Sequence, residues 1–311
     1  MASDLVHIVD EVDQLTPDDE PFLLTAFDGF LDAGKAAGRA AEHLYRVGEG
    51  PVVATLDVDA FYDYRARRPP ITFAQDHYEG FEAPRLVVRL LHDAERTPYL
   101  LLTGPEPDNR WEAFARAVRE VVTRFRVRRV VQLASVPMAV PHTRPIAITP
   151  HGNRPELVHG RSPWRSELRV PSSAQSLLEV RLGEWGHDAQ GFVAHVPHYI
   201  AQLEYPKASV SLLQHASAAT GLVLDLDALV EDARSTEEDI AEHLAENPDV
   251  NEVVAGLEQQ YDAFRRAEDE GHNLLAEDEP LPTSDEIGEQ VEQFLAGLRG
   301  DHPEGPDHPD D

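Results

Sequence analysis

The hydrophobic positions of this 311-residue chain form short apolar runs that alternate with segments of helical periodicity. Polar, Gly or Pro residues bound these runs, as is typical of strands that are buried on both faces. Buried strands are therefore predicted for five segments: Phe22–Phe27, Pro51–Val58, Tyr99–Thr103, Val130–Ser135 and Gly191–Val196. Alternation of such strands with helices predicts an α/β fold with a mixed, largely parallel sheet.

Helical periodicity is clearest between Trp111 and Phe125, where apolar residues recur at i, i+3, i+4 and i+7. Asp108 or Asn109 is the expected cap of this helix. Two further helices are predicted with their caps: Ser172–Trp185 with Ser173, and Lys207–Thr220 with Gly221. A β-hairpin is predicted between Ile71–His77 and Arg85–Leu91, with its turn near Glu79–Gly80.

The pattern changes near Asp227, where acidic helical segments replace the strands. Thr236–Glu246 and Val250–Ala267 read as a helical hairpin that is broken at Asn247-Pro248. A third helix is expected at Asp285–Leu298. The predicted organisation is an α/β domain over residues 1–225, an acidic helical extension over 226–299 and a disordered tail over 300–311.

Charge is distributed unevenly between these regions. The chain has a net charge of −30, and residues 225–311 hold 28 Asp and Glu against four Arg, a net charge of −24. A nucleic-acid partner is not expected, because neutralising phosphates requires a basic surface. The acidic region reads as a solvated helical face that continues into the tail.

Composition narrows the remaining classes of function. The chain has no cysteine, so disulfides, thiolate metal sites and a Cys nucleophile are excluded. No apolar run has the length of a membrane span, and the N-terminal residues lack the basic region and apolar core of a signal peptide. A cytoplasmic protein without a membrane partner is the expectation.

The turn after the first strand contains the spacing of a phosphate-binding loop, with Gly29, Gly34 and Lys35 in the order G-x-x-x-x-G-K. Such a loop needs a Ser or Thr after the lysine to hold Mg²⁺, and this chain has Ala36 there. Asp32 is placed to cap the next helix by accepting from the N–H of Gly34 or Lys35, which are donors that a phosphate would use.

That helix has a face of small residues, which lets it lie close to a sheet. Ala residues recur on this face at helical spacing, followed by two larger apolar residues: Ala36, Ala37, Ala40, Ala41, Leu44 and Val47. A strand–turn–helix packing unit therefore explains the segment without a nucleotide.

Acidic and basic side chains follow several of the predicted strands. Asp28 and Asp32 follow the first strand, and Asp57 and Asp59 follow the second, at the edge where open parallel sheets bind ligands. Carboxylates there can perform acid–base chemistry or cap helices and turns. His142 and Arg144 lie in the proline-bounded segment V-P-H-T-R-P, where they can bind an anion or hydrogen-bond to carbonyl groups.

The candidate ligand site therefore consists of Asp28, Asp32, His142 and Arg144. His195 and His198 are three residues apart on a turn, but no H-E-x-x-H pattern or cysteine completes a metal site. No G-x-S-x-G elbow or dinucleotide fingerprint is present. No cofactor, metal or catalytic residue is assigned from the sequence.

Several short motifs together resemble the type-2 proteasome assembly chaperone family. They occur in family order over roughly residues 20–225: F-D-G-F-L-D-A-G (Phe27–Gly34), T-G-P-E-P (Thr103–Pro107) followed by Trp111, P-H-T-R-P (Pro141–Pro145), V-P-H-Y (Val196–Tyr199) and Y-P-K-A-S (Tyr205–Ser209) followed by Gly221-Leu222. No motif is specific alone, and the order and spacing carry the resemblance.

The resemblance implies a phosphorylase/hydrolase-like three-layer fold with the acidic helices as a C-terminal extension. It also implies homo-oligomers, with trimers as the expected form, and binding of proteasome subunits without chemistry. Three hypotheses follow: an oligomeric scaffold or assembly chaperone, a small-molecule enzyme that binds an anion near Arg144, and a phosphate-loop nucleotide-binding protein.

Overall fold

The computed structural model describes residues 5–9, 15–16, 18–48, 50–158, 167–245 and 248–269. They belong to two compact units, Met1–Glu258 and Gln259–Asp311. In the second unit the described residues continue helix α7 (Pro248–Asp269) to its end. The helix expected at Asp285–Leu298 and the tail at 300–311 lie outside the described residues, and the expected boundary at residue 225 stays a prediction.

The first unit contains a mixed eight-stranded sheet. In spatial order its strands are β1 (Val6–Ile8), β3 (Val52–Leu56), β6 (Leu86–His92), β7 (Pro98–Pro105), β2 (Phe22–Asp28), β8 (Arg129–Met138), β10 (Ala189–Pro197) and β9 (Ile148–Gly152). The neighbours β7, β2, β8 and β10 are parallel, while the outer pairings are antiparallel. The parallel strands β2, β7, β8 and β10 match four of the predicted apolar runs.

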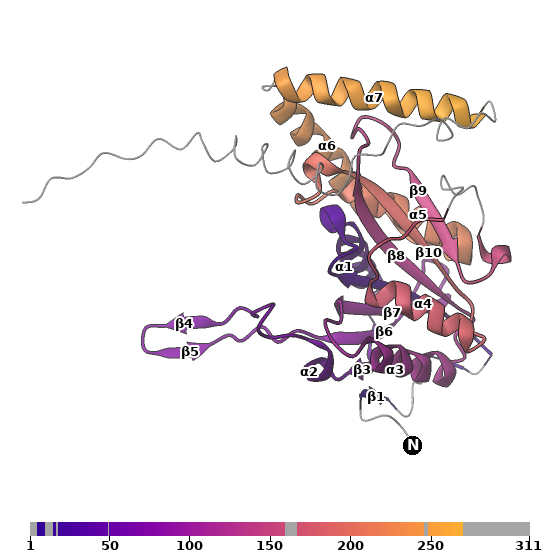
Figure 1. Ribbon diagram of the computed structural model, residues 1–311. Helices are drawn as coiled ribbons and strands as arrows, with labels where there is room; N and C mark the ends of the chain where they lie inside the picture. The colour runs from indigo at the N-terminus through magenta and orange to yellow at the C-terminus, as the bar shows by residue number, and fades with distance from the viewer. Residues whose placement is uncertain are drawn as a thin grey trace, which may run out of the picture. The chain divides into compact units, whose positions relative to one another are not determined.

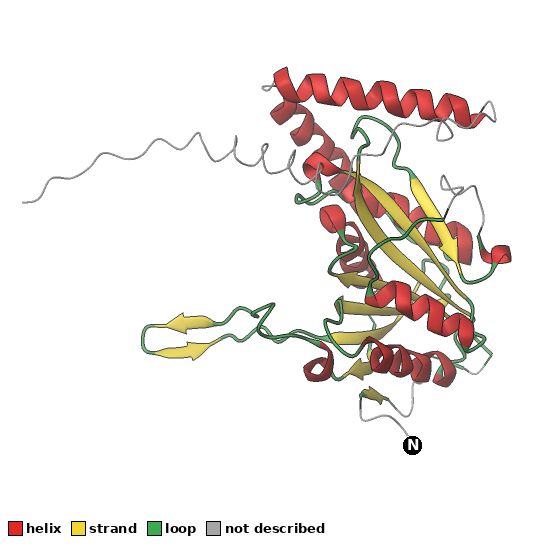
Figure 2. Ribbon diagram, in the orientation of Figure 1, coloured by secondary structure: helices red, strands yellow, loops and turns green. Residues whose placement is uncertain are grey.

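Helices cover both faces of the sheet, which makes three layers (Figure 1, Figure 2). Helices α3 (Trp111–Arg124) and α4 (Ala174–Glu184) pack on one face, and α1 (Ala36–Gly48) and α5 (Pro206–Thr220) pack on the other. Helix α6 (Asp227–Ala245) packs against α5. Successive residues of β2 serve opposite layers, since Leu23 packs with the α3 cluster and Leu24 with the α1 cluster. The expected α/β fold with a mixed, largely parallel sheet between helices is confirmed.

Small residues bring α1 against the sheet, as predicted. Ala36, Ala37 and Ala40 are fully buried, whereas Val47, expected on the same face, is 48% exposed. Val47 lies one residue before the end of α1, and the neighbouring Gly48 is the residue that lies against Leu91 of the sheet. The predicted caps of α4 and α5 are also present: Ser173 forms a capping box with Ser176, and Gly221 ends α5 at φ 78°.

The predicted hairpin between Ile71–His77 and Arg85–Leu91 is wrong. β4 (Thr72–Ala74) pairs with β5 (His77–Glu79) in a separate two-stranded sheet, and β6 pairs with β3 and β7 in the main sheet. All three segments have strand-like sequences, and their order alone does not say which of them pair. The turn, at Gln75–Asp76, therefore lies four residues earlier than predicted.

Other local predictions are also wrong. Arg110, in the left-handed conformation, occupies the N-cap position of α3 instead of Asp108 or Asn109, because the N–H groups of both residues donate to the Phe61 carbonyl. The pattern did not reveal β1 or β9. Both are short strands at the sheet edges, and β9 contains Pro150, which an edge strand tolerates.

Gly104, in the T-G-P-E-P motif, supplies a sharp test of this fold. Its φ is +140°, and a Cβ there would lie 2.1 Å from the Arg85 carbonyl oxygen. Gly104→Ala is expected to lower the free energy of unfolding by at least about 3 kcal/mol, because backbone strain and a clash with main chain combine. Urea denaturation followed by circular dichroism measures the change.

Gly186→Ala is the matched control, because Gly186 has φ +80° but no atom lies within 4 Å of the place that a Cβ would occupy. This variant should lose only about 1–2 kcal/mol from conformational strain. Equal losses for the two variants would contradict the close approach of β6 and β7 at Gly104.

Candidate functional site

The family-like motifs meet at the loops that follow β2, β7, β8 and β10, which we call the rim. These four strands are parallel, so their carboxyl ends lie at one edge of the sheet. An isolated bridge between Asp32 and Ser135 joins the segment after β2 to β8, and the Ser135 hydroxyl donates to the Ala33 carbonyl at 2.7 Å. The rim is therefore one connected surface built from distant parts of the sequence.

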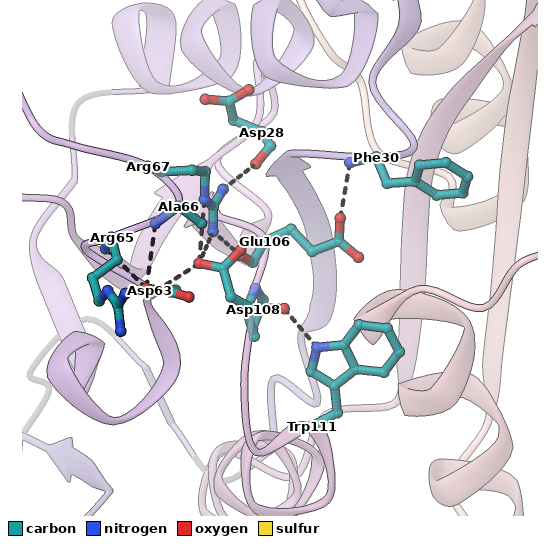
Figure 3. A network of polar contacts seen from close by, with 10 residues as sticks. Asp28, Phe30, Asp63, Arg65, Ala66, Arg67, Glu106, Asp108 and Trp111 are labelled. Carbon is teal, nitrogen blue, oxygen red and sulfur yellow. Dashed lines mark hydrogen bonds and ion pairs between the residues drawn. The ribbon is translucent and has the colours of Figure 1, made fainter.

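Glu106 holds three segments of the rim together, and Figure 3 shows its contact with Phe30. Its carboxylate accepts from the N–H of Phe30 at 2.8 Å and from the N–H of Ala174, the first residue of α4, at 2.9 Å. Its own N–H donates to the Asp28 carbonyl at 2.9 Å. A Cβ at Gly29 would lie 2.5 Å from the Glu106 side chain, which explains the glycine in this turn.

Arg67 anchors a further loop to the same place, as Figure 3 shows. Its guanidinium donates to the Asp108 carboxylate at 2.7 Å and to the carbonyls of Glu106 and Asp28. The Asp63 N–H also donates to Asp108, at 2.7 Å. The sequence pattern does not distinguish Glu106, Arg67 or Asp108 as site residues. Two features of the sequence point toward Glu106: its place in the T-G-P-E-P motif, and the Ser173 cap at the start of α4, where Glu106 binds the Ala174 N–H.

Asp32 caps α1 by a route that differs from the prediction. Its Oδ1 accepts from the N–H groups of Ala37 at 2.7 Å and Gly38 at 3.3 Å. The N–H of Gly34 donates instead to the Ala201 carbonyl, and the N–H of Lys35 to the Asp32 carbonyl. The reason is a short 3₁₀ turn, η1 (Ala33–Lys35), in which Gly34 has φ 65° and Lys35 has φ 49°, so the α-helix begins later.

The N–H groups of the segment with the phosphate-loop spacing are therefore not free to bind a phosphate. The N–H groups between Gly34 and Gly38 bond to groups of the chain itself, as the preceding distances show. The Lys35 ammonium lies 3.2 Å from the Glu204 carboxylate. The geometry favours the packing interpretation of this turn over the nucleotide one.

The Asp32 carboxyl has an altered acidity. Burial raises its pKa to about 6, and the nearby Asp28 carboxylate adds to the increase, while the two α1 N–H groups oppose it. Asp28 itself is exposed. Asp32 thus provides a carboxyl group with a pKa of about 6 close to the Asp28 carboxylate.

His142 is buried and forms hydrogen bonds with Tyr199 and Lys207. The Tyr199 hydroxyl accepts from the His142 N–H at 2.8 Å and lies 2.7 Å from Nδ1, to which it can donate. Lys207 Nζ donates to the His142 carbonyl at 2.9 Å. Burial lowers the pKa of His142, and the Lys207 charge lowers it further, so the ring is neutral at pH 7.

The loop that contains His142 and Arg144 also forms polar contacts with the acidic helix α7. Arg144 forms an ion pair with Glu258 at 3.1 Å, and the Thr143 hydroxyl also donates to Glu258. Lys207 pairs with Glu237 of α6 at 2.6 Å, and Arg39 pairs with Asp232 at 3.2 Å. Carboxylates of α6 and of the first part of α7 thus neutralise cations along this side of the first unit.

The four predicted site residues fall into two groups. Asp28 and Asp32 lie at the end of β2, and His142 and Arg144 lie in the loop after β8, with partners on α5, α6 and α7. A shared ligand that touches all four residues stays a prediction.

His195, one of the two histidines around Pro197, has a polar partner within the chain. His195 lies 2.8 Å from the Thr149 hydroxyl, and burial lowers its pKa to about 4. No group of three or more His, Asp and Glu suited to a metal ion occurs in the described part of the chain. None of the helices in the same ranges is long and apolar enough to cross a membrane.

A family model for the PAC2 family matches residues 26–244. A crystal structure of Rv2714, a Mycobacterium tuberculosis protein of unknown function, is similar at 42% identity and a TM-score of 0.81, covering 86% of this chain and 91% of that one. A Corynebacterium glutamicum protein of unknown function is similar at 34% identity and a TM-score of 0.78, covering 83% and 97%.

A third crystal structure, the M. tuberculosis proteasome-assembly chaperone homologue Rv2125, shares 28% identity and a TM-score of 0.68. The match covers 75% of this chain and 99% of that one. No curated protein matches the sequence.

The raised pKa of Asp32 predicts that the free energy of unfolding depends on pH. The folded pKa lies above the ordinary 3.8, so between about pH 4 and 6 the folded state binds more protons than the unfolded state. The free energy of unfolding should therefore fall as the pH rises through this window, by about 3 kcal/mol in total.

Asp32→Asn keeps an oxygen acceptor for the α1 N–H groups and removes the charge. Its stability advantage over the native chain should grow from near zero at pH 4 to about 2–3 kcal/mol at pH 7, measured by urea denaturation across pH. Asp57→Asn is the control, because Asp57 caps α2 (Val58–Phe61) from an exposed position. A pH-independent difference for Asp32→Asn would contradict the altered acidity.

Proposed function

The chain belongs to the PAC2 family, and we propose that it acts as a non-enzymatic scaffold or assembly chaperone that binds proteasome subunits. The family match and the likeness to a proteasome-assembly chaperone homologue support this proposal. We also propose that it is a homo-oligomer, with a trimer as the expected form, and that it works in the cytoplasm.

The observation that carries the proposal is the presentation of Phe30. Its side chain is 61% exposed, while its N–H is fixed by Glu106, which is itself bonded to α4. Figure 3 shows the ring pointing away from the polar network. An exposed aromatic residue on a fixed turn is typical of a residue that dominates a protein interface, since little conformational freedom is lost on binding.

Leu203 is a second exposed apolar residue, on another rim loop. It is 56% exposed and follows η3 (His198–Ile200), and its N–H donates to the Ile200 carbonyl at 2.9 Å. Carboxylates on α6, including Glu231 and Glu238, are exposed beside Arg234 and give this helix an acidic outer face. The partner should therefore offer an apolar pocket for Phe30 and a basic surface for α6.

Capture of proteasome subunits by immobilised protein tests the proposal. The native chain should retain proteasome α subunits, and Phe30→Ala should weaken their binding at least tenfold, because the residue is an aromatic anchor. Val180→Ala is the control, since Val180 is 53% exposed on α4, away from the β2 turn. Recovery of the protein alone, or equal binding by Phe30→Ala, would contradict the proposal.

A second candidate is a small-molecule enzyme that holds an anion with Arg144 beside Asp28, Asp32 and His142. The raised pKa of Asp32 favours it, because a carboxyl that titrates near pH 6 is suited to acid–base chemistry. An anion at Arg144 would have to displace Glu258 from its ion pair.

Thermal stabilisation by small anions tests this candidate. If it is correct, millimolar phosphate or a dicarboxylate should raise the melting temperature, and Arg144→Ala should abolish the increase. Arg234→Ala is the control, since Arg234 is an exposed arginine that pairs with acidic residues of its own helix. No increase for the native chain, or an increase that survives Arg144→Ala, would contradict the candidate.

A further inference from the structure

Residues 167–170, which we call the entry segment, lead into α4 without belonging to a helix or a strand. All four residues are exposed, although two of them carry large apolar side chains. Leu168 is 48% exposed and Val170 is 74% exposed. Apolar side chains that are exposed next to each other in this way are typical of a surface that a protein partner covers.

The side-chain pattern of the entry segment is that of a half-buried strand. Its sequence, E-L-R-V, alternates charged and apolar residues. In an extended chain Leu168 and Val170 therefore lie on one side, and Glu167 and Arg169 lie on the other. Pro171 follows, and the residue before a proline is restricted to extended backbone. The sequence thus favours a strand in a segment that the structure leaves unpaired.

The main chain of the entry segment has no strand beside it. The main sheet is complete without this segment, and among the described residues no hydrogen bond joins its N–H or carbonyl groups to another part of the chain. Because the segment is exposed, these groups are open to water and to an incoming strand.

The rim fixes the position of the chain just after the entry segment. Ser173 caps α4 and is 1% exposed, and the Ala174 N–H donates to one oxygen of the Glu106 carboxylate at 2.9 Å. The other oxygen of this carboxylate accepts from the N–H of Phe30 at 2.8 Å (Figure 3). One carboxylate thus joins the start of α4 to the turn that presents the Phe30 ring, so a single partner can contact both segments.

We propose that the entry segment pairs as an added strand with an exposed sheet edge of the protein that binds Phe30, an inference that rests on the proposed function. Main-chain hydrogen bonds provide the affinity of such a contact, and Leu168 and Val170 pack on one face of the partner's sheet. Pro171 has no N–H, so the pairing ends before α4 begins. The restricted backbone before Pro171 reduces the entropy that pairing costs.

The sheet edges of this chain are poorer partners for such a strand. β9 bonds to β10 through Ala147 with His195 and through Asn153 with Ala189, so the backbone of Pro150 faces the outer edge, where it offers no N–H. β1, at the other edge, has only three residues. Both features are typical of edges that resist the addition of a strand. The sheet edge of a different protein is therefore the better complement.

Residue-resolved amide exchange tests the proposed pairing. In the isolated protein the N–H groups of the entry segment should exchange as fast as those of an unstructured chain. When proteasome α subunits are bound, alternate N–H groups should slow at least about 100-fold while those between them stay fast, because successive N–H groups of a strand point to opposite edges.

Capture of proteasome α subunits tests the apolar side of the same strand. Leu168→Ser/Val170→Ser should weaken their binding at least about tenfold, because the side chains that pack on the partner are lost. Val47→Ser/Val180→Ser is the control, since both valines are about half exposed and lie in the later turns of α1 and α4, away from the rim loops. The control should bind like the native chain, and urea denaturation should show that both double variants fold.

The outcomes separate this inference from the proposed function. Failure of the native chain to capture α subunits would contradict the proposed function itself. Capture that requires Phe30 but is unchanged by Leu168→Ser/Val170→Ser would overturn only the inference. Exchange that is already slow in the isolated protein would overturn it too, because the segment would then pair within the chain or with a second copy. Uniform slowing in the complex, without alternation, would show that the partner covers the segment without pairing as a strand.

Discussion

The structure of the rim depends on the hydrogen bonds of one carboxylate, that of Glu106. By accepting from Phe30 and from the first residue of α4, it joins the turn after β2 to the end of β7 and to the helix layer on one face of the sheet. The Asp28 carbonyl accepts in turn from the Glu106 N–H. This arrangement requires Gly29, whose missing side chain leaves room for Glu106, and it leaves Phe30 exposed on a fixed backbone.

The other polar groups of the rim are also held mainly by partners within the chain. Asp32 caps α1, Tyr199 bonds to His142, and carboxylates of α6 and α7 pair with Lys207 and Arg144. Such satisfied contacts create a rigid surface and reduce the entropy that binding a protein would cost. The acidic helices are thus connected to the rim by ion pairs, and they extend the proposed binding surface with charge.

Local patterns predicted the parts of this fold whose causes are local. The apolar runs of β2, β7, β8 and β10, the amphipathic repeat of α3, the Ser173 cap and the Gly221 end of α5 each depend on residues within one segment. Contacts between distant segments could not be predicted in this way. The partner of β6, the role of Glu106 in joining α4 to the β2 turn, and the later start of α1 depend on which elements meet in space.

Amide hydrogen exchange over residues 28–36 tests most directly whether the rim is a preorganised protein-binding surface. We expect slow exchange at Phe30 in the isolated protein, because Glu106 accepts from this N–H, and still slower exchange over the segment in complex with proteasome subunits. Fast exchange at Phe30 in the isolated protein, or exchange that is unchanged in the complex, would contradict this expectation.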